Sequence, residues 1–137
     1  MRSLHVAVLD EELPFPLTSG KRIRTYNLLA RLATRHRVTI LCHTNPDRHE
    51  QLAAEEAFRE LGIETVVVDQ TVPPKSGPSF YARLAGNLLS PLPYSVATHA
   101  SPALAEAVRM HAAGNRVDVW HCEWTPYAQV LRDALGD

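Results

Sequence analysis

The segment His121-Cys122-Glu123-Trp124 brings an imidazole, a carboxylate and an indole to the end of an apolar run. His and Glu are common proton-transfer groups, and the flat face of Trp offers apolar area for a sugar ring. Alternation in an extended chain places His121 and Glu123 on one side and Cys122 on the other. The segment indicates acid–base chemistry or sugar binding. The alternative is a core His121 beside an exposed Glu123.

A basic cluster is a second group of residues suited to binding a ligand. Its members are Lys21, Arg22 and Arg24. They follow Thr18-Ser19-Gly20 at the start of a predicted helix, and residues 21–37 contain six basic residues and no acidic one. The positive end of a helix dipole disfavours cations and favours an anion such as a phosphate. This helix start is a predicted anion site, unless Glu11 and Glu12 neutralise it or the cations point into water.

Two nucleotide-binding motifs are absent from the loop before this helix. Gly20 is the only glycine before position 62, so no Gly-x-Gly-x-x-Gly fingerprint exists. The phosphate-binding P-loop motif is absent as well. Phe15 stands where its first glycine is needed, and Arg22 stands where it has Ser or Thr. NAD-dependent dehydrogenases and P-loop NTPases are therefore disfavoured.

Composition limits the remaining classes. The chain has 137 residues, the size of one ordinary domain, with 14 Lys+Arg against 15 Asp+Glu. Its net charge of -1 argues against a general nucleic-acid binder. The strand-like start at Leu4 predicts no signal peptide, so Cys42 and Cys122 are expected to be free thiols in the cytoplasm. Neither belongs to a Cys-x-x-Cys pair, and no metal is expected.

Strand-like and helix-like segments alternate along the chain. Strands are predicted at 4–9, 37–42, 63–68 and 117–122, and helices at 21–35, 47–61, 79–89, 102–112 and 127–135. This alternation predicts an α/β fold, a Rossmann-like parallel sheet with helices on both faces. Ligands of such sheets bind where the strand order reverses, at the carboxyl ends of the strands. With the first strand in the centre, loop 10–20 is the first place to look.

The stretch from Ser79 to Leu92 is apolar apart from Arg83. Such a helix can lie on a lipid surface, but its apolar stripe is more often a core face. We therefore expect it to be buried.

Several segments together resemble the opening of bacterial family 4 glycosyltransferases, especially those of exopolysaccharide and cell-surface glycan synthesis. They are 14–29, 32–33, 36–39, 92–96, 101–104 and 117–121. The resemblance covers nearly the whole chain and rests on the order and spacing of these segments. It implies a GT-B enzyme of the hexosyltransferase type, with two Rossmann-like domains, retention of anomeric configuration and no need for a divalent metal.

The resemblance implies that residues 1–137 are a truncated N-terminal, acceptor-side domain without the C-terminal domain that binds the nucleotide-sugar donor. Two domains need roughly 250–300 residues, so we expect no activity from this chain alone. The expected partners are a nucleotide sugar, a glycan or lipid-linked acceptor and the missing domain, with no nucleic acid. The expected location is the cytoplasm, with peripheral contact at the inner membrane face left open.

The resemblance also assigns residues. Ser19-Gly20 matches the loop that approaches the donor diphosphate, although the family has Gly-Gly, and Lys21 and Arg24 are the neighbouring contacts. His121, Trp124 and Tyr94 fall on the acceptor side. Where many members have His-x-His, this chain has His121 and Glu123, so the role of the second His is not transferred. We expect Glu123 to orient a hydroxyl of the acceptor substrate.

Two other functions remain open at this point. A phosphorylase or an epimerase can use the same two-domain fold. From a different class, the chain can be a freestanding module that binds a glycan or a phosphorylated ligand without turnover. Continuation of the reading frame past Asp137 into a second Rossmann-like domain separates the enzymes from the module.

Overall fold

The computed structural model describes residues 2–136, so Met1 and Asp137 lie outside it. The elements are β1 (His5–Asp10), α1 (Gly20–Ala33), β2 (Arg37–His43), α2 (Arg48–Glu60), β3 (Glu64–Val68), α3 (Pro78–Asn87), α4 (Tyr94–His99), α5 (Pro102–Gly114), β4 (Val119–Cys122) and α6 (Pro126–Leu135). The predicted alternation is confirmed, although β4 begins two residues later than expected.

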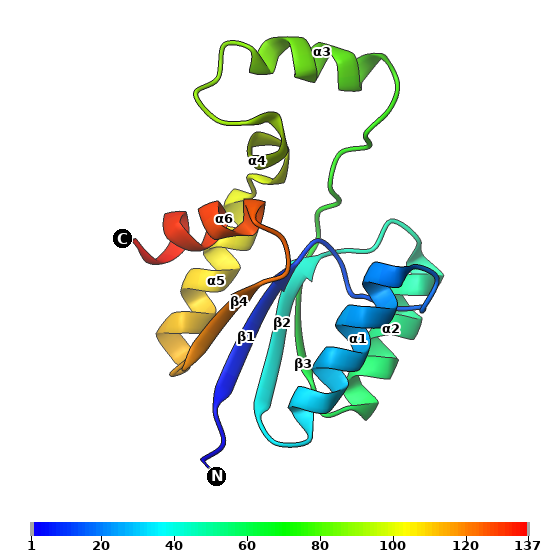
Figure 1. Ribbon diagram of the computed structural model, residues 1–137, viewed down its shortest axis with the longest axis vertical. Coiled ribbons are helices and arrows are strands. Elements are labelled where there is room, and N and C mark those ends of the chain that lie inside the picture. Colours follow the sequence, from blue (N-terminus) through cyan, green and yellow to red (C-terminus); the bar gives the residue numbers. More distant parts are fainter. Residues whose placement is uncertain (1, 137) are drawn as a thin grey trace.

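Within the described residues the strands form one parallel sheet in the order β3-β2-β1-β4. The chain runs outward from β1 to β3 and then crosses to the other side of β1 to form β4 (Figure 1). The order therefore reverses at β1, which is central as predicted. Asp10 at the end of β1 and Glu123 just after β4 lie at this reversal, where open α/β sheets bind ligands.

Helices cover both faces of the sheet, as predicted (Figure 1). One core joins α1 and α2 to the sheet, and the other joins α5 and α6 to the opposite face. The first contains Val6, Val8, Leu13, Leu29, Val38, Ile40, Cys42, Ala54, Phe58 and Ile63, and the second Ala7, Leu9, Leu41, Leu104, Ala105, Val108, Tyr127 and Val130. β1 and β2 supply both cores through alternate residues, because both of their faces are covered.

Local signals in the sequence set the helix boundaries. The Asp47 carboxylate accepts hydrogen bonds from the amides of His49 and Glu50 and caps α2. Gly62 follows this helix with φ of 70°, a conformation that glycine adopts without strain. Ser101 caps α5 by accepting from the Leu104 amide at 3.1 Å. These residues set where α2 begins and ends and where α5 begins.

The region between β3 and α5 departs from expectation in two ways. None of the residues of α3, all of which are described, is buried, so the expected core face of Ser79–Leu92 is wrong. Figure 1 shows α3 standing away from the sheet, at the end of an extended connection from β3. The short helix α4, which begins at Tyr94, lies between the helices predicted at 79–89 and 102–112, where no element was predicted. Pro93 occupies the N-cap of that helix.

Across residues 2–136, the helices are all too short or too polar to cross a bilayer.

Candidate functional site at the carboxyl end of the sheet

Glu123 is the centre of a polar cluster at the reversal of strand order. Its amide donates to the Leu9 carbonyl at 3.0 Å, which fixes its backbone beside β1. The Thr25 hydroxyl donates to Oε1 at 2.9 Å, and Arg24 donates to the same oxygen. His121 Nε2 donates to Oε2 at 3.0 Å. Both carboxylate oxygens are thus hydrogen-bonded by side chains from α1 and β4.

The predicted pairing of His121 and Glu123 on one side is confirmed by this hydrogen bond. The exposed fractions are the opposite of those in the alternative interpretation, which had a core His121 beside an exposed Glu123. The His121 side chain is 45% exposed, whereas that of Glu123 is 3% exposed. An exposed imidazole in contact with a buried carboxylate is an arrangement in which a ligand can reach the ring.

Glu123 is held as a carboxylate. Burial raises the pKa of its carboxyl, but hydrogen bonds from His121 and Thr25 and the charge and hydrogen bond of Arg24 outweigh burial. The pKa of Glu123 consequently lies below its ordinary value. The group is suited to accepting a hydrogen bond from a hydroxyl, and it is unsuited to acting as a general acid at neutral pH.

The basic start of α1 is compensated by carboxylates. Lys21 Nζ lies 2.6 Å from Asp10 Oδ1, and Arg22 contacts Glu12 at 2.6 Å and Glu50 at 3.0 Å. Arg24 is paired with Glu123. Of the alternatives left open by the sequence, neutralisation is the one that the structure favours. Glu12 takes part as expected, but Glu11 does not pair with Lys21, Arg22 or Arg24. An anion-binding role for this helix start stays a prediction.

Asp10 is the most buried carboxyl of this region, and its Oδ2 has no hydrogen-bond partner. Burial raises its pKa, against the lowering effect of the Lys21 charge and hydrogen bond. Asp10 Oδ1 accepts from Lys21 and from the Glu11 amide. The residue anchors Lys21 at the end of β1 and keeps its ammonium beside the loop that precedes α1.

Trp124 lines an open hollow of about 470 Å³ next to Glu123. The other lining residues are Arg24, Ser95, Thr125 and Pro126. Lys75 Nζ lies 5.2 Å from the centroid of the indole ring, a cation–π geometry, and His99 packs on the indole ring with centroids 5.7 Å apart. The hollow therefore combines a carboxylate, a guanidinium and an aromatic face, which are the groups that bind sugars and their phosphates.

Three other residues singled out from the sequence are not among those that line this hollow, namely Ser19, Gly20 and Tyr94. Ser19 is the N-cap of α1, and its hydroxyl accepts from the Arg22 amide at 3.2 Å. A Cβ on Gly20 would meet open space, so packing does not require glycine there. Tyr94 packs on Phe80 with ring centroids 5.7 Å apart and lines a different hollow, between α3 and α4. The structure does not bring Tyr94 to Glu123.

Three contributors to this cluster are not among the residues singled out from the sequence. Thr25 is buried on α1 and contacts Glu123, while Asp10 pairs with Lys21. Lys75 reaches Trp124 from the connection between β3 and α3. A hydroxyl on the inner side of a predicted helix and an acid that ends a buried strand are signals that point to Thr25 and Asp10. Nothing local marks Lys75.

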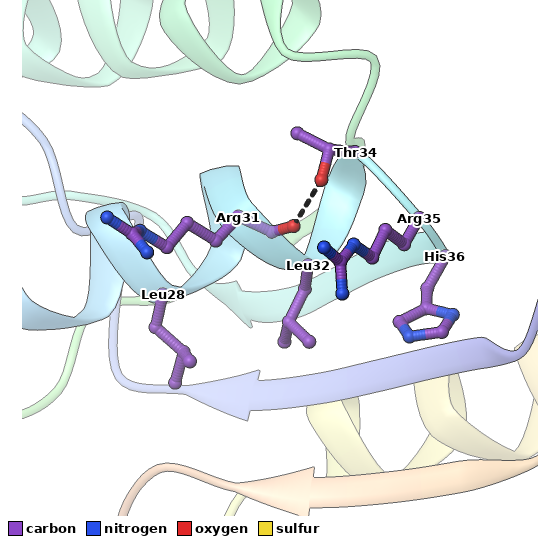
Figure 2. A pocket seen from close by; sticks show the side chains of 6 residues that line it. All are labelled: Leu28, Arg31, Leu32, Thr34, Arg35 and His36. Carbon is purple, nitrogen blue, oxygen red and sulfur yellow. Dashed lines mark hydrogen bonds between the residues drawn. The ribbon is translucent and has the colours of Figure 1, made fainter.

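A third hollow, of about 390 Å³, lies at the amino end of the strands, between the end of α1 and the start of β2 (Figure 2). Its lining residues are Leu28, Arg31, Leu32, Thr34, Arg35 and His36. The Thr34 hydroxyl donates to the Arg31 carbonyl at 2.7 Å, and His36 Nδ1 accepts from the Leu4 amide. The first contact closes the end of α1, and the second joins the following turn to the residue before β1. Because ligands of such sheets bind at the carboxyl ends of the strands, we place the candidate site at Glu123. Among residues 2–136, no group of His, Cys, Asp and Glu is arranged to hold a metal ion.

Comparisons with protein-family models, with curated proteins and with solved structures find no match to this chain. The fold and the geometry around Glu123 are therefore the observations on which a function can be argued.

Proposed function

We propose that this chain is the acceptor-side domain of a retaining glycosyltransferase that moves a sugar from a nucleotide-sugar donor to a glycan or lipid-linked acceptor. The observation that supports it best is the buried Glu123 carboxylate at the reversal of strand order, beside a hollow that Trp124 lines. The resemblance of segments 14–29 and 117–121 to family 4 enzymes points the same way.

In this proposal Glu123 and Trp124 hold the acceptor substrate. Ionised Glu123 accepts a hydrogen bond from a sugar hydroxyl, and the indole of Trp124 packs on an apolar face of the ring. Exposed His121 contacts a second hydroxyl. Orientation of one hydroxyl toward the donor is the contribution that this domain makes to the reaction, because correct placement removes much of the barrier to a two-substrate reaction.

The donor diphosphate approaches Ser19, Gly20 and Lys21 at the start of α1. Open space in front of Gly20 leaves room for it, and the first amides of a helix bind phosphate oxygens. Arg24 is 68% exposed and pairs with Glu123, so it can also reach a phosphate. A second domain supplies most donor contacts. The free thiols of Cys42 and Cys122 fit the reducing cytoplasm, where the proposal places the enzyme.

The test uses the product of the complete reading frame that encodes this chain, assayed with a panel of nucleotide sugars in the presence of a chelator. Transfer or donor hydrolysis is the expected result. Glu123→Gln should lower turnover about 10- to 100-fold, the effect of losing a hydrogen bond to a charged group. Glu56→Gln, which alters an exposed pair with Arg59, is the matched control. Near-normal turnover of Glu123→Gln would refute the assigned role.

A binding module without turnover is the second candidate, and the compensated charges of α1 favour it. Each cation of the basic cluster already has a carboxylate partner, so a phosphate must compete with Asp10, Glu12 or Glu123. A reading frame that stops after Asp137, with glycan binding that Trp124→Ala abolishes, would establish the module. A requirement for inorganic phosphate, or epimerised sugar without transfer, would identify a phosphorylase or an epimerase.

A further inference from the structure

Two arginines beside the hollow at the amino end of the strands have no partner (Figure 2). Arg31 lies in the last turn of α1, and Arg35 lies in the turn that follows it. Among residues 2–136, no carboxylate or hydrogen-bond acceptor contacts either guanidinium. The cations of the basic cluster, at the start of the same helix, all pair with carboxylates. The positive charge of α1 is therefore compensated at its start and uncompensated at its end.

The two arginines share one helical face with two leucines. Leu28, Arg31, Leu32 and Arg35 stand at positions i, i+3, i+4 and i+7, and all four line the hollow. The Arg35 amide donates to the Leu32 carbonyl at 3.0 Å, so the turn continues the path of the helix. Like charges at a spacing of four residues repel each other. An anion at this face would relieve that repulsion.

The helix dipole does not account for the unpaired guanidiniums. A cation near the end of a helix is favourable where it lies close to the last carbonyl groups. Figure 2 shows the Arg31 guanidinium directed back along α1, away from Thr34. The Arg31 carbonyl accepts from the Thr34 hydroxyl instead. The charge of Arg31 is consequently left for a ligand.

His36 adds a third donor to the hollow. Its Nδ1 accepts from the Leu4 amide at 3.3 Å, so the proton of the neutral ring is on Nε2. In the described part of the chain, no group accepts from Nε2. An N–H group without a partner, in a hollow that two guanidiniums also line, is suited to an anionic oxygen.

The charge and the apolar lining together indicate the class of ligand. A phosphate monoester carries about −1.5 to −2 at neutral pH, which matches two guanidiniums, and guanidiniums bind phosphate oxygens in pairs. Leu28 is 43% exposed and offers apolar area to the organic part of such an ester. The volume of about 390 Å³ falls within the range of small-molecule sites, about 300–1,000 Å³.

We infer that this hollow binds a small phosphate monoester with an apolar body. Arg31 and Arg35 hold the phosphate, and His36 Nε2 donates to one of its oxygens. Leu28 and Leu32 contact the organic part. The hollow lies at the opposite end of the strands from the candidate site, so the inference is independent of the proposed transfer.

Titration of the chain with phenyl phosphate, followed by nuclear magnetic resonance, tests the inference. Binding should shift the methyl signals of Leu28 and Leu32 and the ring signals of His36. Inorganic phosphate lacks the apolar body, and methyl phenyl phosphate is a diester with less charge, as in a phospholipid headgroup. Each of these two probes should bind at least about threefold more weakly than phenyl phosphate.

Arg35→Gln should weaken the binding of phenyl phosphate at least about tenfold, because it removes charge-assisted hydrogen bonds. Arg48→Gln is the matched control. Arg48 is an exposed arginine at the start of α2, likewise without a partner among residues 2–136, and its variant should keep full affinity. Both positions are exposed, and unchanged circular dichroism should confirm that the variants fold.

Several results would overturn the inference. They are no binding of phenyl phosphate, an affinity for either of the other probes that equals or exceeds it, and an equal loss in both variants. Shifts confined to Gly20 and Lys21 would overturn it as well, since the phosphate would then bind at the start of α1, where the proposed function places the donor.

Discussion

Glu123 illustrates how neighbours decide the chemistry of a single residue. Its side chain is almost fully buried, which alone would favour the neutral acid. Thr25, Arg24 and His121 reverse that preference by hydrogen bonding and charge, and they leave an ionised group at the edge of an open hollow. A buried carboxylate with these partners contributes to stability as well as to binding.

Replacement of Glu123 by Gln should destabilise the fold by about 1–2 kcal/mol, because Gln keeps the size but loses the charge that the donors require. Urea unfolding at neutral pH measures this loss. Glu56→Gln serves as the control, since it alters an exposed pair with Arg59 and should have no measurable effect. Equal stability of the two variants would show that the Glu123 cluster is not a stabilising network.

His43 provides a prediction on pH. Burial at the end of β2 lowers its pKa; the nearby charge of His99 acts in the same direction, and contact with Glu11 opposes it. The unfolded chain binds a proton at the ordinary pKa of about 6.5, while the folded chain does not, so stability falls as pH drops from 6.5 toward the lowered value.

His43→Leu should remove this part of the pH dependence. The limiting slope that one such group contributes is about 1.4 kcal/mol per pH unit. Urea unfolding at pH 7.5 and at pH 5.5, for the unaltered chain and the variant, gives the comparison. The variant should lose less stability on acidification, with a residual dependence from His111, whose pKa burial also lowers. Identical losses in both proteins would contradict the prediction.

At the scale of elements, strands and long helices could be predicted because their signals are local. The apolar runs of β1 and β2 and the periodicity of α2 mark them directly, and Gly62 follows the end of α2. The six residues of α4 are too few to carry a periodic pattern. The sequence shows that α3 has an apolar stripe, but it does not show whether that stripe is buried. Periodicity reveals an apolar face without revealing what the face packs against.

The N-cap of α5 leads to a prediction about the stability of the fold. Ser101 is buried and accepts from the Leu104 amide, and α5 delivers Leu104 and Val108 to the second core. Ser101→Ala should cost about 1 kcal/mol of unfolding free energy, the usual effect of losing a cap. Ser79→Ala on exposed α3 is the control and should change stability by no more than about 0.5 kcal/mol. A similar loss in both would show that the cap is not what matters.

For the molecule as a whole, the order of strands could be predicted with β1 in the centre, and with it the edge where the site lies. The partners of Glu123 could not, because Arg24 and Thr25 lie nearly a hundred residues away and meet it only once β4 has paired with β1. Because β1 and β2 contribute to both cores, one sheet joins the helices on its two faces. We therefore expect the sheet and the helices that cover it to unfold together.

The position of α3 outside both cores leads to a different expectation for that helix. Its amides should exchange with solvent through local opening, whereas those of β1 and β2 should exchange only when the whole fold opens. Phe58 is buried in the first core, and Phe58→Leu should lower global stability by about 1 kcal/mol. Hydrogen exchange measured by mass spectrometry should then show about fivefold less protection in β1 and β2. Protection in α3 should stay unchanged, because its opening does not break the sheet. A loss of the same factor in α3 would mean that the helix unfolds only with the cores, and that its exposed leucines belong to the same cooperative unit.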